Sequence, residues 1–134
     1  MYKKEAFRHL DKKYNSHLYS GMLGILMSYC HRKLEVFKKR NENFDKILEI
    51  GAGSAPHFKY INDSYNEYHI AETSDYAFSF LEENEKVKLK KYDGKVLPYK
   101  DEYFDRIIIS HCLEHILSRS EERRVGKECR SRWS

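Results

Sequence analysis

Apolar side chains in the first third of the chain recur at helical spacing. Between about residues 11 and 39 they mostly stand three or four positions apart. They are Leu18, Met22, Ile25, Leu26, Tyr29, Val36 and Phe37. This period predicts one or two amphipathic helices, in which Gly21 or Gly24 is a weak point. The stripe is typical of a helix whose apolar face covers a core, and a helix lying on a membrane surface is the alternative.

Four short apolar runs further along the chain predict strands. They are Lys46–Ile50, Tyr68–Glu72, Val87–Tyr92 and Asp105–Ser110. Lysines alternate with apolar residues in the third run, as in a strand with one face in water. The fourth run is β-branched without alternation, which predicts a strand buried on both faces.

A helix start lies between the second and third predicted strands. Ser74 followed by Asp75 is typical of an N-cap, so we expect a helix from there to about Glu83. Strands that alternate with helical segments predict an α/β fold with a parallel sheet.

The composition is that of a single folded domain. The chain has 134 residues, of which 40% are hydrophobic and 14% aromatic. Domains commonly have about 100–150 residues, and this aromatic content argues against a disordered chain. The longest apolar stretch, residues 18–30, is shorter than the roughly 20 residues that span a bilayer, so we expect no membrane span.

The three cysteines, Cys30, Cys112 and Cys129, are an odd number with wide spacing. Because they form no C-x-x-C pair, they indicate neither a disulfide framework nor a thiolate metal site. We therefore expect a reducing, cytoplasmic setting and no bound metal. His57 and His69 are interpreted as structural or solvated residues.

A glycine-rich turn follows the first predicted strand. Gly51 and Gly53 allow a sharp turn and let a ligand approach the backbone. Glu72 ends the second predicted strand about 20 residues later, where a carboxylate can accept ribose hydroxyls. A nicotinamide dinucleotide site shares these features, but Pro56 stands where its third glycine is expected. A solvated or capping role for Glu72 is the other alternative.

Five motifs in order now resemble one family. They are Leu48-Glu-Ile-Gly-Ala-Gly-Ser54, Glu72-Thr-Ser74, Tyr92-Asp-Gly94, Leu97-Pro98 and Phe104-Asp-Arg-Ile-Ile-Ile-Ser-His-Cys-Leu-Glu-His-Ile116. Together, over residues 44–116, they resemble class I S-adenosylmethionine-dependent methyltransferases of the small-molecule kind called type 11. The resemblance implies a Rossmann-like parallel sheet, here the N-terminal half of the fold preceded by N-terminal helices, with S-adenosylmethionine as the cofactor.

The resemblance also implies roles for residues of the glycine turn. Glu49, Gly51, Ala52 and Gly53 would shape the pocket for the amino acid part of the cofactor. Ala55 stands where many members have a further glycine, a tolerable departure.

The later motifs would hold the nucleoside. Glu72, which is aspartate in many members, would bind the ribose hydroxyls. Asp93 would bind the adenine amine, with the backbone of Gly94 beside the ring. His111 would lie near the methyl donor.

The acceptor is expected to be a small molecule, and its reacting atom (oxygen, nitrogen or carbon) is left open. His111 and His115 are weak candidates for a general base, because the unperturbed pKa of histidine suits proton transfer near neutral pH. The alternative is that His115, with Glu114, only fixes the start of a helix. No oligomeric state is indicated.

The net charge of +4 lies mostly at the end of the chain. Residues 1–117 hold 19 basic and 18 acidic side chains, whereas residues 118–134 hold six and three, and five of those six are arginines. This end is similar to translated cloning sequence at the ends of unrelated open reading frames. An arm for nucleic-acid phosphates is the alternative, but Glu121, Glu122 and Glu128 dilute its charge, so we expect no nucleic-acid partner.

We therefore expect three segments. Residues 1–43 are an N-terminal helical cover, residues 44–117 an incomplete methyltransferase core, and residues 118–134 an Arg-rich, non-native tail. From residue 117 onward, the only side chains that could contribute to a core are those of Leu117, Val125, Cys129 and Trp133. The alternatives to a methyltransferase are a nicotinamide-dependent oxidoreductase, a non-catalytic nucleotide-binding module and an inactive fragment.

Overall fold

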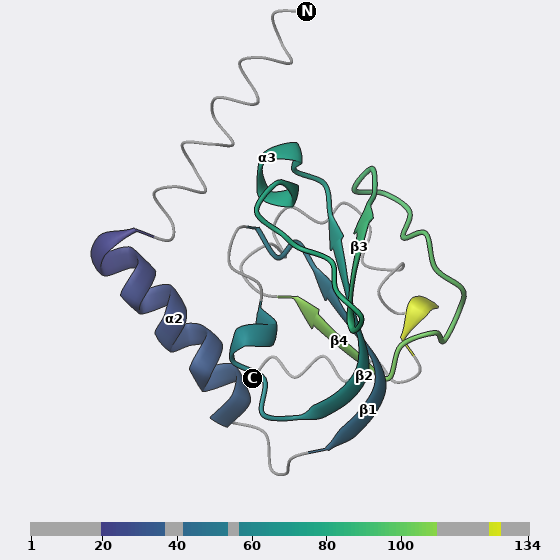
Figure 1. The fold of residues 1–134 in the computed structure, drawn as a ribbon, viewed down its shortest axis with the longest axis horizontal. Helices are drawn as coiled ribbons and strands as arrows, with labels where there is room; N and C mark the ends of the chain where they lie inside the picture. Colours follow the sequence, from purple (N-terminus) through teal and green to yellow (C-terminus); the bar gives the residue numbers. More distant parts are fainter. Residues whose placement is uncertain (1–19, 37–41, 54–56, 110–123, 127–134) are drawn as a thin grey trace, which may run out of the picture.

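A computed structural model describes residues 20–36, 42–53, 57–109 and 124–126 (Figure 1). Its centre is a parallel sheet of four strands in the order β3-β2-β1-β4. The strands are β1 (Asn43–Ile50), β2 (Ser64–Glu72), β3 (Val87–Lys91) and β4 (Arg106–Ile109). Each lies where an apolar run predicted it, so the α/β fold with a parallel sheet is confirmed.

Three helical segments accompany these strands. They are α2 (Gly21–Val36), the 3-10 helix η1 (His57–Lys59) and α3 (Asp75–Phe78). The predicted N-cap of α3 is confirmed, since the Ser74 hydroxyl accepts a hydrogen bond from the Ala77 N–H at 3.0 Å. The predicted end near Glu83 is wrong: the chain leaves the helix after Phe78, and Leu81 then packs into the core.

The two central strands carry the core on both of their faces. Ile47 of β1 and Tyr68 and Ile70 of β2 form one apolar cluster with η1 beside it. Leu48 of β1 forms a second cluster on the opposite face, where Phe104 covers it. Burial of each such side chain contributes about 1.5–3 kcal/mol, so these strands hold the sheet in place.

Strand β4 is less buried than its composition predicted. Only Ile108 is buried, while Ile107 and Ile109 are half-buried. Among the described strands β4 pairs with β1 alone. A strand with one neighbour leaves part of its side chains uncovered, so the prediction of burial on both faces is wrong for two of the three isoleucines.

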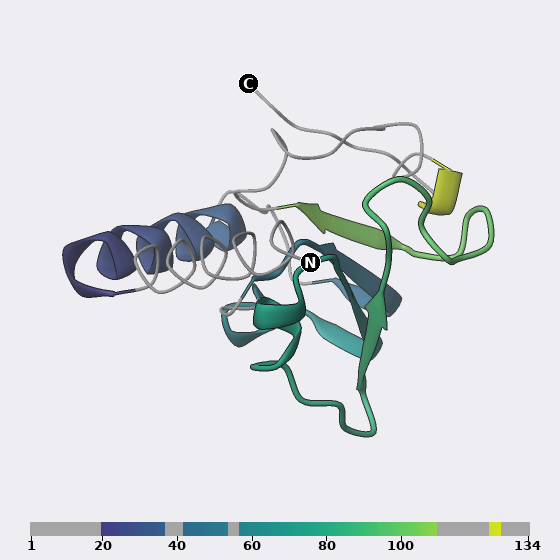
Figure 2. The same cartoon turned by 90° about the horizontal axis from the view of Figure 1, so that it is seen from above.

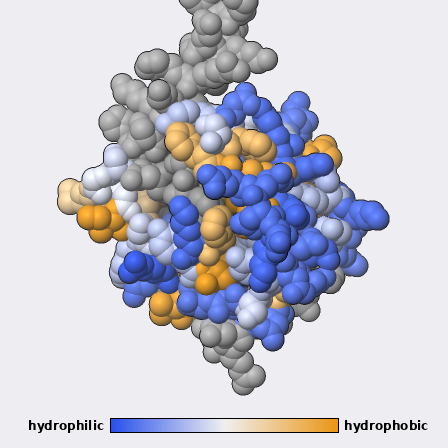
Figure 3. Space-filling model, in the orientation of Figure 1, coloured by the Kyte–Doolittle hydropathy of each residue, from blue (hydrophilic) through white to orange (hydrophobic). Residues whose placement is uncertain are grey.

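Helix α2 presents a different face to the sheet from the predicted one. Its buried residues are Met27, His31 and Glu35, which recur every four positions. The apolar stripe points outward instead: Met22 is 87% and Ile25 74% exposed. The helix lies beside the sheet in Figures 1 and 2, and apolar side chains are visible at that edge of the molecule in Figure 3.

The prediction that this stripe covers a core is therefore wrong within residues 21–36. The cause is a set of polar partners on the sheet side, which bind the two polar residues of the buried face, as described below. No helix in the described part of the chain is long and apolar enough to cross a membrane.

Three residues of the predicted tail are described, and they pack against the segment before β4. Val125, one of the four side chains named above as able to form a core, is fully buried in the second cluster. Its carbonyl accepts a hydrogen bond from the Phe104 N–H at 2.9 Å. The Arg124 guanidinium donates to the carbonyls of Leu97 and Tyr99. The three-segment division, with a non-native tail after residue 117, stays a prediction.

Candidate functional site

The predicted motifs meet at one edge of the sheet. Strands β1, β2 and β3 run parallel, so Gly51, Glu72 and Asp93 follow or end their strands on the same side. Hydrogen bonds connect neighbouring strand ends here, from the Gly51 N–H to the Ala71 carbonyl at 2.9 Å and from the Tyr92 N–H to the Glu72 carbonyl at 3.2 Å. Ligands of open parallel sheets bind at this carboxyl edge.

The glycine turn has the conformation that only glycine adopts freely. Gly51 has a φ of 67° and Gly53 a φ of 58°, in the left-handed region where a Cβ is unfavourable. Ala52 between them is 2% exposed and packs into the first apolar cluster. The predicted tight turn is confirmed, and Ala52 anchors it to the core.

Glu72 joins the glycine turn to the next loop. Its carboxylate accepts the Gly53 N–H at 2.9 Å through Oε2, and the Thr73 and Ser74 N–H groups at 2.7 and 2.9 Å through Oε1. The residue is only 4% exposed. A carboxylate offers about four acceptor positions, so these three bonds use all but one of them.

The loop after β3 lies against the loop after β2. Gly94 has a φ of 81°, and a Cβ on it would stand 3.5 Å from Cγ2 of Thr73. The exposed Asp93 carboxylate accepts the N–H groups of Val96 and Lys95, and these hydrogen bonds lower its pKa. An ionised carboxylate is thus held at the third strand end, where it can accept from an amine.

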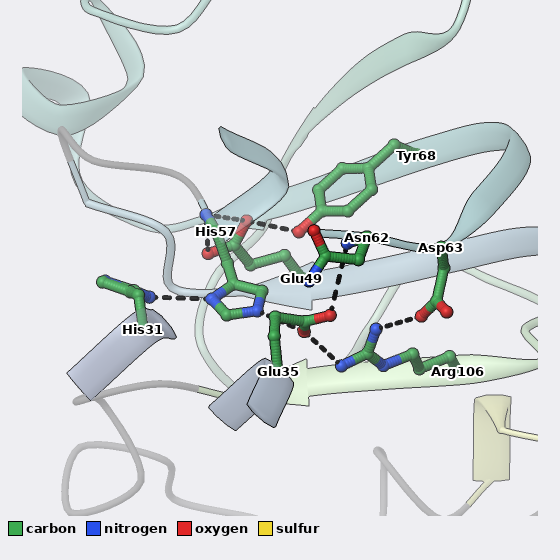
Figure 4. A network of polar contacts seen from close by, with 8 residues as sticks. All are labelled: His31, Glu35, Glu49, His57, Asn62, Asp63, Tyr68 and Arg106. Carbon is green, nitrogen blue, oxygen red and sulfur yellow. Dashed lines mark hydrogen bonds and ion pairs between the residues drawn. The ribbon is translucent and has the colours of Figure 1, made fainter. Parts of the chain in front are cut away.

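Glu49 lies inside the protein, below the glycine turn. Both carboxylate oxygens accept the His57 N–H at 2.9 Å, and Oε2 also accepts the Tyr68 hydroxyl at 2.8 Å (Figure 4). Complete burial raises the pKa of Glu49 to about 7, against the lowering effect of these hydrogen bonds. Glu49 therefore fastens the backbone of His57 to strand β1.

The raised pKa of Glu49 makes stability depend on pH. The carboxyl group has a pKa of about 7 in the folded chain against 4.5 for an ordinary glutamate, so its stabilising contribution is complete below pH 4.5 and lost as pH rises through 7. The free energy of unfolding of the parent protein should therefore decline by up to about 3 kcal/mol between pH 5 and 8. We expect Glu49→Gln, which cannot ionise, to remove this decline. Urea unfolding of the parent and of Glu49→Gln at pH 5 and at pH 8 measures the decline.

Glu83→Gln is the matched control, because Glu83 is exposed and accepts only the Leu89 N–H. That variant should keep the decline seen in the parent protein. Equal declines in the parent and in Glu49→Gln would contradict an ionising Glu49 in the folded state.

A polar network that the sequence did not reveal lies beside Glu49. Its members come from α2, η1, the segment before β2, and β4, and Figure 4 shows them converging. The His57 imidazole contacts Glu35 Oε1 through Nε2 at 2.8 Å, and the Arg106 guanidinium contacts the same oxygen at 2.7 Å and Asp63 Oδ2 at 2.7 Å. No spacing signal could have found it, since Glu35 and Arg106 are 71 positions apart.

Two of the predicted site residues, His111 and His115, lie outside the described residues, as do Ala55 and Pro56. The others are brought together in two groups. Gly51, Gly53, Glu72, Asp93 and Gly94 line the carboxyl edge of the sheet, whereas Glu49 and Ala52 support the loop from within. The predicted roles of all these residues toward a cofactor stay predictions.

Solved structures described as S-adenosylmethionine-dependent methyltransferases share this fold. A protein from Methanococcus maripaludis, titled as an S-adenosyl-L-methionine-dependent methyltransferase, has a TM-score of 0.66 at 11% identity, over 89% of this chain and 58% of that one. A SAM-dependent methyltransferase from Aquifex aeolicus has a TM-score of 0.60 at 15% identity, over 95% and 77%. DhpI, in a complex with SAM and HEP, has a TM-score of 0.56 at 14% identity, over 90% and 54%.

The chain thus spans 58% of the first of these proteins and 54% of DhpI. A comparison with curated proteins finds no significant match. A family model described as a methyltransferase domain matches residues 48–131, which include the glycine turn, Glu72 and Asp93. The family and its neighbours indicate S-adenosylmethionine as the cofactor. The chain belongs to the methyltransferase-domain family.

Proposed function

We propose that the chain is the cofactor-binding part of an enzyme that transfers a methyl group from S-adenosylmethionine to a small molecule. The observation that carries the proposal is the junction of Glu72 and Gly53. A nearly buried carboxylate with one acceptor position left lies beside a turn whose glycines expose the backbone. This donor and acceptor set suits a ligand with an amino acid end and a ribose.

Residues of the site would divide the cofactor between them. Gly51 and Gly53 would lie along the amino acid part, because no Cβ stands in the way. Glu72 would accept from a ribose hydroxyl, and Asp93 from the adenine amine with Gly94 beside the ring. His111, directly after β4, would lie near the methyl group.

The bound sulfonium supplies an activated methyl group, so the chain has little covalent chemistry to perform. Its residues bind the cofactor, orient the acceptor and exclude water. His111 and His115 are the proposed candidates for a general base where the acceptor must lose a proton.

A small acceptor and a cytoplasmic setting belong to the same proposal. Residues 1–117 are almost neutral, which gives no general attraction for a polyanion. Cys30, half-buried and unpaired, suits a reducing compartment. The segments 1–43, 44–117 and 118–134 keep their proposed roles of helical cover, core and tail.

Titration of S-adenosylhomocysteine into the chain by calorimetry tests the proposal. We expect saturable binding at micromolar ligand that NAD does not compete away. Asp93→Ala should weaken it about tenfold, the usual loss for one hydrogen bond to a charged group. Asp101→Ala, at another exposed loop aspartate, is the matched control and should bind as the parent does.

Binding of NAD without binding of S-adenosylhomocysteine would reverse the proposal in favour of an oxidoreductase. A folded chain that binds neither compound would exclude a cofactor site at this sheet edge.

A further inference from the structure

His57 connects helix α2 to the end of strand β1, just before the glycine turn. Glu35 and His31 stand four positions apart on the buried face of α2 and point at the His57 ring (Figure 4). Glu35 Oε1 contacts Nε2 and His31 Nδ1 contacts Nδ1, each at 2.8 Å. Both ring nitrogens are therefore engaged, which leaves the ring one orientation.

The main chain of His57 connects this residue to strand β1. Its N–H donates to both oxygens of Glu49, the residue of β1 two positions before the glycine turn. The glycine turn begins at Gly51, and the Gly53 N–H donates to Glu72. His57 is thus joined to β1, just before this turn, by its backbone and to α2 by its side chain.

The charge of Glu35 determines the direction of the hydrogen bond. Burial alone would raise the pKa of its carboxyl, but the hydrogen bonds from His57 and Arg106 and their charges lower that pKa to about 2. An ionised carboxylate only accepts, so Nε2 of His57 must carry the proton. Arg106, which also binds Asp63, keeps the carboxylate in place from the side of β4.

We propose that Glu35 is a positioning residue, which acts through His57 and Glu49 to hold the glycine turn, Gly51 to Gly53, in the conformation that binds the cofactor. This inference rests on the proposed function, because it names what orders that same site. A loop that is already ordered loses less conformational entropy on binding, so the affinity of the site depends on this contact.

Four variants separate positioning from general stabilisation. Glu35→Gln removes the charge that orients the ring. His57→Asn is too short to reach Glu35, whereas His57→Gln can place its amide N–H near the position of Nε2 and should rescue the contact. Tyr60→Phe is the matched control, because it removes another bond to α2, from the Tyr60 hydroxyl to Ser28 Oγ at 3.0 Å, and leaves the network intact.

Amide hydrogen exchange gives a readout that needs no ligand. We expect Glu35→Gln and His57→Asn to speed exchange at Gly53 and His57 about tenfold, the effect of losing one charge-assisted hydrogen bond. Exchange at Ile70, in the centre of β2, should speed up less than exchange at Gly53 in either variant, because it reports only the change in global stability. His57→Gln and Tyr60→Phe should exchange as the parent does at all three positions.

Calorimetric titration with S-adenosylhomocysteine provides the second readout. The affinity should fall about tenfold in Glu35→Gln and His57→Asn and stay within about twofold in the other two variants. Unchanged exchange at Gly53 in Glu35→Gln, equal acceleration at Ile70, or failure of that variant to fold would each overturn the proposal in favour of a general structural role. A parent chain with a protected turn that binds no S-adenosylhomocysteine would count against the proposed function, while the exchange data would still decide the role of Glu35.

Discussion

Replacement of Glu72 by alanine is expected to weaken binding of S-adenosylhomocysteine by about 100-fold or more. Two losses combine in this variant. The ligand loses a charged acceptor for its ribose, and the glycine turn loses the bond from the Gly53 N–H that joins it to β2. Each hydrogen bond to a charged group contributes about 1.5–3 kcal/mol, so the two together exceed the 2.7 kcal/mol, or roughly 100-fold, predicted here.

Calorimetric titration measures this loss, and circular dichroism shows whether the variant is folded. Asp75→Ala is the matched control, because Asp75 lies three positions away and forms a surface ion pair with Lys91. Exposed pairs of this kind contribute little, so the control should bind within about twofold of the parent. A folded Glu72→Ala chain with the parent affinity would exclude Glu72 from the site.

Arg106→Met is expected to lower the free energy of unfolding by about 3–5 kcal/mol, the usual result of breaking a buried ion pair from one side. The Arg106 guanidinium bridges two carboxylates whose side chains are 2% and 0% exposed, those of Glu35 and Asp63. Methionine fills similar space but removes the guanidinium that both carboxylates contact. Since whole domains are stable by about 5–15 kcal/mol, this single loss is large.

Urea unfolding at pH 7 measures the change, with Lys46→Met as the control. Lys46 pairs with Asp45 at the surface, so its replacement should cost less than about 1 kcal/mol. The pKa of Glu35 in the folded chain, about 2, lies below the 4.5 of an ordinary glutamate, so the stability that this carboxylate contributes is present above pH 4.5 and lost as pH falls toward 2. The difference in free energy of unfolding between the parent and Arg106→Met should therefore narrow over that range. A constant difference would show that the loss does not come from the contact of Arg106 with the Glu35 carboxylate.

Local features of the fold could be predicted because neighbouring residues cause them. The apolar run before Gly51 predicted β1, and the Ser74 hydroxyl predicted the start of α3. The spacing of the glycine turn and Glu72 places both at the carboxyl edge of the sheet, and the Gly53 N–H donates to the Glu72 carboxylate there at 2.9 Å. In each case the physical cause lies within a few residues, or in the strand order that a parallel sheet imposes.

The sequence by itself determined the strands, the glycine turn and the carboxylate that faces it, because backbone conformation and hydrophobic period are local properties. Only the tertiary structure decided which face of α2 is buried and how deeply β4 is covered. Hydrophobic period reports which side chains avoid water, not which distant groups they meet. Glu35 is buried because His57 and Arg106, 22 and 71 positions away, satisfy its charge. No local sequence pattern predicts a contact between residues so far apart in the chain.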